Sequence, residues 1–183
     1  MRQYDKDSIK KIKKDKYIEL SSNTLPNINQ FDERNQIHIQ NVISIMNILS
    51  ELIKTSGSTH DYTKLSEPLR TLYYINMYNA IREEKNFEES EWYNIHIDNE
   101  RYHIKDRNNK VKSDIDLIDI LEHICNTVCS GREKGQSKDI SVTDIDSKIL
   151  SKAFQNTVKL INTIVVYDDE SEQDVNTDAE SDD

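Results

Sequence analysis

Glycine and proline are scarce in this chain, with three glycines and two prolines among 183 residues. Because these two residue types supply most tight turns, their scarcity argues against a turn-rich all-β fold. Lys, Glu and Leu, which favour helices, are abundant instead. The length fits one full-sized domain and is short for two. The sequence therefore predicts an all-α fold: a single helical domain of about five to six helices.

Long hydrophobic runs are also missing, since no stretch approaches the roughly 20 apolar residues that span a bilayer. The basic N-terminus is not followed by an apolar segment, so it does not have the pattern of a secretory signal. The chain has only two cysteines, Cys125 and Cys129, and we expect them to be small buried hydrophobic residues. These features favour the reducing cytoplasm of a bacterial or host cell and no membrane partner.

Acidic charge is confined largely to one end. Residues 168–183 contain nine acidic and no basic side chains, and without these nine the net charge of −10 becomes −1. We expect a basic flexible arm over 1–25, a helical domain over 26–166, and a disordered acidic tail over 167–183. The tail is interpreted as solubilising, with recruitment of a basic partner as the alternative. A nearly neutral domain does not suit long nucleic acid as the substrate.

Apolar residues at helical spacing predict the helices themselves. The expected ranges are 37–54, 68–84, 89–103, 115–130 and 146–164, with Ser113 or Asp114 capping the fourth. In the helix predicted over 68–84 the expected inner face consists of Leu69, Leu72, Tyr73, Asn76, Met77 and Ala80. The face of the fourth helix that is expected in the core consists of Leu117, Ile118, Leu121, Ile124, Cys125 and Val128. In the last helix the expected core face consists of Ile149, Leu150, Ala153, Phe154, Thr157, Val158, Ile161 and Ile164.

The most informative short string is T-H-D-Y-T-K, in which His60 and Asp61 place an imidazole next to a carboxylate. His38, upstream, begins the apolar stripe of the first predicted helix. These three side chains and a later carboxylate form a mixed ligand set for a divalent metal ion, Mn, Fe, Co, Ni, Zn or Mg, with one or two ions bound. Lys64 lies one turn after Asp61, where it pairs with a phosphate or orients that carboxylate.

A second group of polar residues follows at helical spacing. His96, Glu100 and His103 share one face of the helix predicted over 89–103, with Trp92 packed beneath them. Two residues compete for the closing ligand position, Asp119 and the neutral Asn126. Glu122 is one helical turn from both positions and is able to compensate.

These strings resemble the HD-domain superfamily of metal-dependent phosphohydrolases over roughly residues 30–165. H-D-Y-T-K is similar to the H-D-x-x-K form of that superfamily, and W-Y-N-I-H-I-D-N-E-R-Y-H-I is similar to a small, poorly characterised branch found in phages and bacteria. The resemblance implies that His38, His60 and Asp61 are metal ligands, with Asp119 closing the set. It also implies that His96 and His103 bind a second metal ion or the substrate phosphate. The branch has an acidic residue where this chain has Asn126. A neutral amide at that position is expected to reduce metal affinity or turnover and to leave the fold unchanged.

Two functions follow as hypotheses. The first is a phosphomonoesterase or phosphodiesterase acting on a small nucleotide-like phosphate ester. Its metal is held by His38, His60, Asp61 and Asp119, and its catalytic groups are Lys64, His96, Glu100 and His103. The second is a binding or regulatory protein, cellular or viral, that keeps the HD scaffold with weakened catalysis. The sequence leaves the oligomeric state open, a homo-oligomer included.

Overall fold

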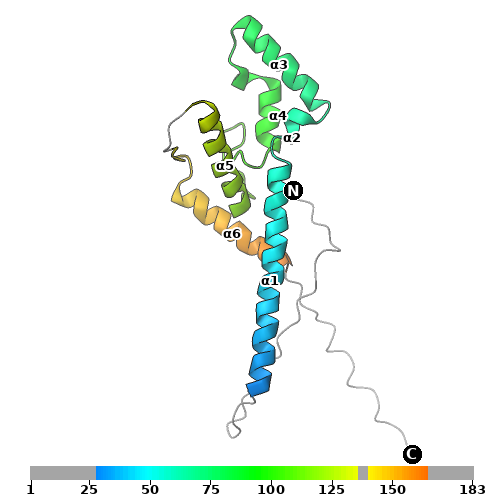
Figure 1. Ribbon diagram of the computed structural model, residues 1–183. Helices are drawn as coiled ribbons and strands as arrows, with labels where there is room; N and C mark the ends of the chain where they lie inside the picture. Colours follow the sequence, from blue (N-terminus) through cyan, green and yellow to red (C-terminus); the bar gives the residue numbers. More distant parts are fainter. Residues whose placement is uncertain (1–27, 136–139, 165–183) are drawn as a thin grey trace, which may run out of the picture. The chain divides into compact units, whose positions relative to one another are not determined.

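The computed structural model of the chain describes residues 28–135 and 140–164. These residues form six α-helices and one 3-10 helix, which confirms the predicted all-α fold (Figure 1). The only extended pairing within these ranges is an isolated antiparallel bridge between Lys105 and Val111. The predictions for the basic arm and the acidic tail concern residues outside the described ranges. The elements are α1 (Ile28–Ser58), α2 (Tyr62–Leu65), α3 (Leu69–Glu83), η2 (Phe87–Glu89), α4 (Glu91–Asn99), α5 (Leu117–Glu133) and α6 (Ser147–Ile164).

The described residues fall into two compact units. The second unit comprises Leu49–Leu160, and the first comprises residues 28–48 and 161–164. One boundary falls inside α1, after Ile48, so that the last turns of this helix belong to the second unit. Of the predicted site residues, His38 belongs to the first unit and all the others belong to the second. The second unit is therefore where a site can be built from the structure.

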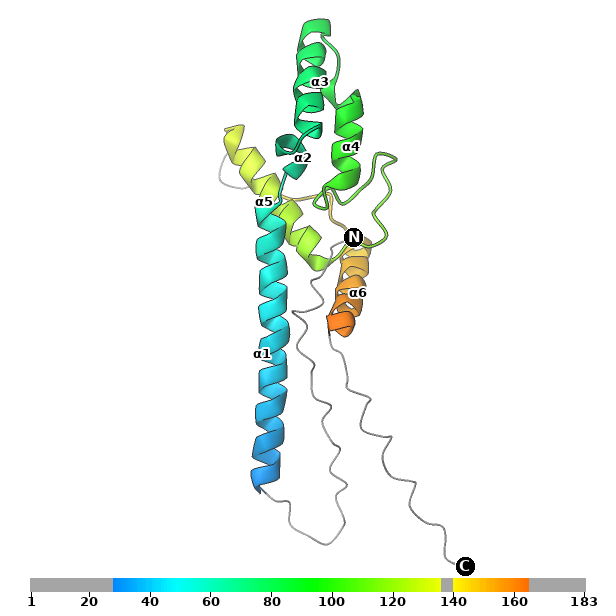
Figure 2. The same ribbon diagram turned by 90° about the vertical axis from the view of Figure 1, so that its right-hand side faces the viewer.

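Within the second unit, α3 agrees with its prediction and α4 does not. The face of α3 expected to point inward is half-buried while its other residues are exposed, and α3 packs against α2, η2 and α4 (Figures 1 and 2). Helix α4 is shorter than predicted. It begins after Ser90, whose hydroxyl accepts a hydrogen bond from the backbone N–H of Tyr93, and it ends at Asn99. Glu100 is already extended, so Glu100 and His103 do not continue the helical face of His96.

Helix α5 begins two residues later than predicted, and its cap is Asp116, not Ser113 or Asp114. The Asp116 carboxylate accepts from the backbone N–H groups of Ile118 and Asp119, and the Asp119 carboxylate accepts from the N–H of Asp116. This reciprocal pair is a capping box. It satisfies N–H groups that have no partner within the helix and fixes where α5 starts.

The predicted inner face of α5 is largely wrong. Four of its six members are exposed, namely Leu117, Leu121, Ile124 and Cys125, and Cys129 is exposed as well. The helix turns its polar stripe inward because Asp119, Glu122 and His123 make specific hydrogen bonds there. The expectation of two buried cysteines therefore fails for the same reason.

The apolar core of the second unit is small and joins α5, α6 and the segment before α5. It consists of Ile104, Ile115, Ile120, Ile149 and Ala153, with Val111 and Ile145 packed against it. The N-terminus of α5 is tied to α6 because the backbone N–H of Leu117 donates to the Thr157 hydroxyl at 2.9 Å. On α6 the expected core positions Leu150, Phe154 and Val158 are exposed. Only one edge of the predicted apolar stripe of α6 is buried in the core.

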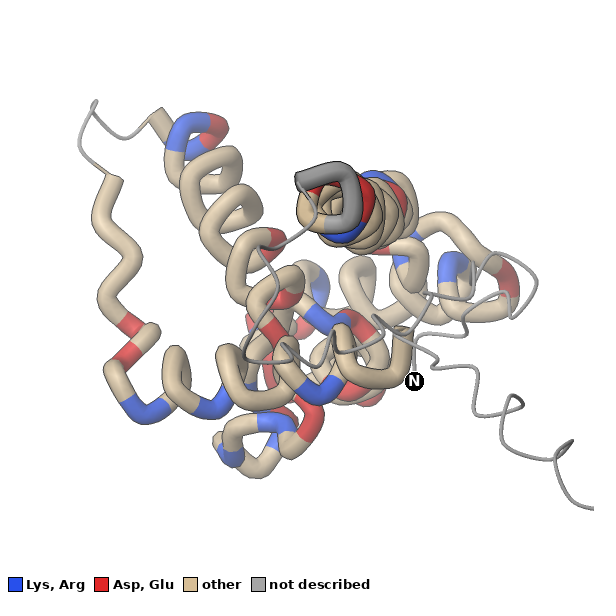
Figure 3. The backbone as a smooth tube through the Cα atoms, turned by 90° about the horizontal axis from the view of Figure 1, so that it is seen from below, with Lys and Arg blue, Asp and Glu red and all other residues tan. Residues whose placement is uncertain are grey.

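Charged residues of both signs occur along α1, α3 and α5, whereas α6 carries only lysines (Figure 3). These are Lys148, Lys152 and Lys159. None of the described helices is long and apolar enough to cross a bilayer.

Candidate metal centre

Asp61 is placed by an unusual backbone conformation. It lies directly before the short helix α2 and adopts the left-handed region, with φ 58° and ψ 27°. Aspartate tolerates this region better than most residues, although a helix N-cap is usually extended. Its carboxylate is not used to cap α2. The side chain is therefore free of the ordinary capping role and is directed into the cluster described next.

Three side chains bring ligand atoms together in the second unit. One atom each from Asp61, His96 and Glu100 lie within 4.8 Å of one another. His96 comes from the last turn of α4, and Glu100 is the residue that ends that helix. Both are buried, with 3% of each side chain exposed. Two carboxylates and one imidazole are a donor set that suits Zn, Mn, Fe, Co or Ni, so the residues present fit a metal ion.

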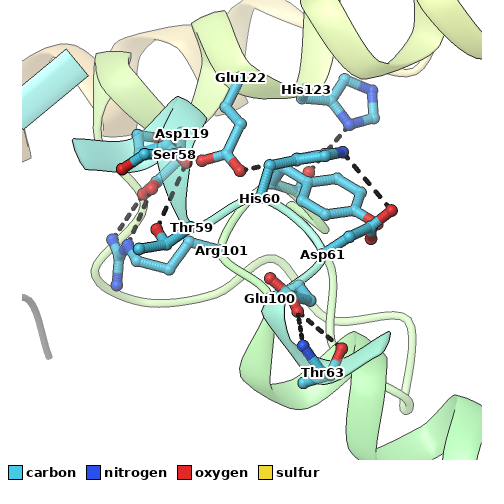
Figure 4. A network of polar contacts seen from close by, with 12 residues as sticks. Ser58, Thr59, His60, Asp61, Thr63, Glu100, Arg101, Asp119, Glu122 and His123 are labelled. Carbon is cyan, nitrogen blue, oxygen red and sulfur yellow. Dashed lines mark hydrogen bonds and ion pairs between the residues drawn. The ribbon is translucent and has the colours of Figure 1, made fainter. Parts of the chain in front are cut away.

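Thr63 links His96 to Glu100 and is fully buried on α2. Its backbone N–H and its hydroxyl both donate to Glu100 Oε1, at 2.9 and 2.6 Å (Figure 4). The same hydroxyl oxygen lies 2.7 Å from His96 Nδ1. With Glu100 ionised, the hydroxyl proton of Thr63 is directed at that carboxylate, and Nδ1 donates its own proton to Thr63. The lone pair of His96 is then on Nε2.

The hydroxyl of Tyr102 contacts both Asp61 and His96. It donates to Asp61 Oδ1 at 2.7 Å, and its oxygen is 3.0 Å from His96 Nε2. A phenol has one proton and cannot donate to both atoms. With His96 neutral, the lone pair of Nε2 therefore faces a lone pair of the Tyr102 oxygen. A cation at this point would remove the mismatch, which is the strongest sign in the structure that the cluster is built for one.

Burial and neighbouring charges set the protonation states of these groups. Burial lowers the pKa of His96 to about 4, so its imidazole is neutral and available as a ligand near neutral pH. Burial raises the pKa of Glu100. Burial also acts to raise the pKa of Asp61, but hydrogen bonds from Lys64 and Tyr102 outweigh it and lower that pKa overall. Lys64 Nζ lies 2.6 Å from Asp61 Oδ2, as the H-D-x-x-K spacing predicted.

His60 is held by a separate set of contacts. Its Nδ1 lies 3.0 Å from Glu122 Oε1 on α5, and the Ser56 hydroxyl donates to the other oxygen of that carboxylate. The carboxylate fixes the tautomer, with the proton on Nδ1 and the lone pair on Nε2. Nε2 lies 3.8 Å from Asp61 Oδ2, and about 29% of the His60 side chain is exposed (Figure 4). His60 is thus next to Asp61, but it is not one of the three clustered ligands.

Asp119, the predicted closing ligand, is held by Arg101. Arg101 Nε and Nη2 lie 2.8 and 2.5 Å from the two Asp119 oxygens (Figure 4). Asp119 is 1% exposed and also completes the capping box of α5. Burial acts to lower the pKa of Arg101, but its bonds to Asp119 and Asp114 raise it overall. This carboxylate therefore has a structural partner in the place of a metal ion, and Asn126, half-buried on α5, is not among the clustered ligands either.

His103 connects the cluster to a surface hollow. Its ring centroid is 4.8 Å from that of His96, and burial lowers its pKa to about 3. His103 also lines a hollow of about 300 Å³ between α4, α5 and the segment that joins them, together with Lys105, Arg107 and His123. Nε2 of His103 is buried and has no hydrogen-bond partner among the described residues. The hollow therefore adjoins the cluster through His103.

His38 is the one predicted ligand in the first unit. Its side chain is exposed on α1, which does not agree with the predicted start of a buried stripe. Its role as a ligand stays a prediction.

The sequence reasoning missed two residues of the network, Thr63 and Tyr102. Thr63 occupies one of the variable positions of H-D-x-x-K, and Tyr102 is adjacent to the predicted His103. Neither is a common metal ligand type, so only their buried hydroxyl groups reveal them. Glu122 was noted as a compensating acid for the closing ligand, and its observed contact is with His60 instead.

Comparison with known proteins gives one match. A protein-family model described as "Family of unknown function (DUF5662)" matches residues 27–165. This stretch contains all of the candidate ligands discussed above. No curated protein matches the chain, and no solved structure matches it.

Proposed function

The chain belongs to the family of unknown function DUF5662, and we propose that it is a metal-dependent phosphohydrolase that acts on a small nucleotide-like phosphate ester. The observation that carries the proposal is the buried cluster of Asp61, His96 and Glu100, with unmatched lone pairs at its centre. The resemblance of the His60-Asp61 string to HD-domain phosphohydrolases supports the same chemistry. Either a phosphomonoesterase or a phosphodiesterase is consistent with this arrangement.

A metal ion held by the three ligands would supply Lewis acidity and neutralise charge on the phosphoryl oxygens. The protein's own groups would do the rest. Lys64, 38% exposed and bound to Asp61, is able to reach a phosphate oxygen while it holds that carboxylate in place. His60 has its lone pair on Nε2 and is partly exposed, so it is placed to accept a proton from the attacking water. Glu122 would stabilise the imidazolium that results.

The substrate would enter from the hollow lined by His103, Lys105 and Arg107. Arg107 forms an ion pair with Asp98. Lys105, which also lines the hollow, has no ion pair among the described residues. A volume of about 300 Å³ is at the lower end of the range for small-molecule sites. This size favours a single nucleotide-like ester over a polymer.

One observation favours a second function, a binding or regulatory protein with weakened catalysis. Asp119, one of the four ligands predicted from the sequence, is held by Arg101 in the described structure. His96 and Glu100 are also deeply buried, which restricts the access of substrate to an ion between them. Such a protein would bind metal, or metal with nucleotide, without turnover.

Metal analysis of the purified full-length protein separates these functions when it is combined with hydrolysis assays. The substrates are nucleotides and generic phosphodiesters, with Mn²⁺, Co²⁺ or Mg²⁺ supplied. We expect stoichiometric metal and hydrolysis in the wild type, and loss of both in Asp61→Asn. The matched control is Glu83→Gln, an acidic residue of the same unit that pairs with Lys85, away from the cluster and from the residues that line the hollow. Bound metal without turnover would favour the second function, and protein that binds no metal would exclude both.

A further inference from the structure

The hydroxyl of Tyr102 contacts two of the three clustered ligands, Asp61 and His96. The hydroxyl oxygen lies 2.7 Å from Asp61 Oδ1 and 3.0 Å from His96 Nε2, atoms that are themselves 3.7 Å apart. We propose that Tyr102 is a fourth metal ligand, bound as a phenolate, and that the site it completes takes a ferric ion. This inference rests on the metal site of the proposed function, although it does not require hydrolysis.

The Tyr102 side chain has little freedom to leave the site. It is 3% exposed, and its ring packs between those of His60 and His103, with centroid distances of 4.4 and 4.3 Å. Its backbone carbonyl is also 3.0 Å from Nδ1 of His123 on α5. Both faces of the ring and the backbone are thus held, so an incoming ion meets the hydroxyl where it now lies.

The separation of these two ligand atoms limits where an ion can lie, and the Tyr102 hydroxyl occupies one side of the line that joins them. An ion about 2.1 Å from both His96 Nε2 and Asp61 Oδ1 fits within their separation of 3.7 Å. An ion on the side of the Tyr102 hydroxyl would lie too close to the hydroxyl oxygen unless that oxygen moved away to the length of a metal–oxygen bond. Because the ring is fixed, this small shift is easier than removal of the whole side chain. The oxygen then becomes a ligand.

The charge of the set points to a trivalent ion. Asp61, Glu100 and a Tyr102 phenolate carry three negative charges, His96 is neutral, and the Lys64 ammonium 2.6 Å from Asp61 Oδ2 offsets part of the charge of that carboxylate. Three of the four donor atoms are hard oxygens, which suit ferric iron better than soft ions. On binding, the O–H bond of Tyr102 breaks, an iron–oxygen bond forms, and the proton passes to solvent, while the iron stays ferric throughout. A bound cation favours the deprotonated form of a coordinating group.

Ferric iron bound to a phenolate absorbs visible light through charge transfer, which gives a readout that does not depend on activity. The full-length protein is freed of metal with a chelator and titrated with ferric nitrilotriacetate. We expect a visible band that saturates at one equivalent of iron, is lost in Tyr102→Phe, and is kept in Tyr78→Phe. Tyr78 is the matched control because it is 63% exposed on α3.

Several results would overturn the proposal. Iron bound without a visible band, or a band that survives in Tyr102→Phe, would show that Tyr102 is not a ligand. Binding of Zn²⁺ or Mn²⁺ but not of iron would overturn the ferric site and leave the proposed function standing. Failure to bind any metal would overturn both. If Tyr102→Phe loses its helical circular dichroism, resonance Raman spectra of the iron-loaded wild type decide instead: tyrosinate ring modes are expected, and their absence contradicts the proposal.

Discussion

Asp119 shows how one carboxylate can serve structure where a ligand was predicted. Both of its oxygens are bound by Arg101, and one of them also accepts from the backbone N–H of Asp116. Burial raises the pKa of Asp119, so the ion pair with Arg101 is what keeps the buried charge tolerable. The residue therefore stabilises the start of α5 and the segment that holds Tyr102.

We expect Asp119→Asn to lower the free energy of unfolding by about 3 kcal/mol, because Arg101 is left as a partly buried charge without its main partner. Metal stoichiometry should stay unchanged, since Asp119 is not among the clustered ligands. Urea denaturation and metal analysis of the same preparation measure the two effects. Glu133→Asn, at an exposed position of α5, is the control for stability. Loss of metal from a stably folded Asp119→Asn protein would restore Asp119 as a ligand, as the sequence predicted.

At the scale of elements, periodicity identified the helices correctly but oriented some of them wrongly. The face of α3 was predicted well because no buried polar group competes with its apolar residues. On α5, hydrogen bonds of Asp119, Glu122 and His123 turn the polar stripe inward and leave Leu121 and Ile124 exposed. A pattern of apolar residues contains no information about such long-range polar contacts, which join residues up to 66 positions apart.

The end of α4 was also not predictable from the spacing of residues alone. Spacing alone suggested one helical face from Trp92 to His103, but the helix ends at Asn99, where Lys112 Nζ donates to the carbonyls of Ile97 and Glu100. The cluster forms because the chain leaves the helix at Glu100. His60, Asp61 and Lys64 were found from the sequence because they are neighbours in the chain. The roles of Tyr102 and Thr63 depend on tertiary packing.

The segment that carries His96 and His103 should make the protein sensitive to acid. Burial lowers the pKa values of these residues to about 4 and about 3, below the ordinary value of 6.5. Between pH 6.5 and 4 the unfolded chain then binds more protons than the folded chain. The free energy of unfolding is therefore highest above pH 6.5 and decreases as the pH falls through this range. The raised pKa of Glu100 has the opposite effect on the pH dependence of the unfolding free energy. A comparison of the pH dependence of two variants is therefore more informative than that of the wild type alone.

We expect the unfolding free energy of the wild type to fall by about 1 kcal/mol per pH unit more than that of His103→Gln between pH 6 and 4, since glutamine does not titrate. Denaturant unfolding of metal-free protein at several pH values measures this difference. Asn79→Gln, at an exposed position of α3, is the control and should keep the wild-type slope because neither asparagine nor glutamine titrates. Parallel profiles for the wild type and His103→Gln would contradict a buried neutral His103.

At the scale of the whole molecule, His38 belongs to the first unit and the other candidate site residues belong to the second. All three clustered ligands and Trp92, the only tryptophan of the chain, belong to the second unit. Trp92 is 1% exposed and stacks on His96 with a centroid distance of 4.6 Å. Its fluorescence therefore reports the unfolding of the unit that carries the cluster.

A metal ion that binds only the folded protein should stabilise this unit by about 2.7 kcal/mol at a free concentration 100 times its dissociation constant. We expect the unfolding transition detected by Trp92 to shift accordingly, and the shift to disappear in Glu100→Gln while it persists in Glu91→Gln, an exposed position on α4. His38→Ala tests whether the first unit supplies a metal ligand. If the three-residue cluster and Tyr102 are sufficient, this variant keeps most of the shift, whereas a loss as large as that in Glu100→Gln would show that α1 supplies a ligand, as the sequence predicted. A wild-type transition that does not respond to any metal would contradict the metal site itself.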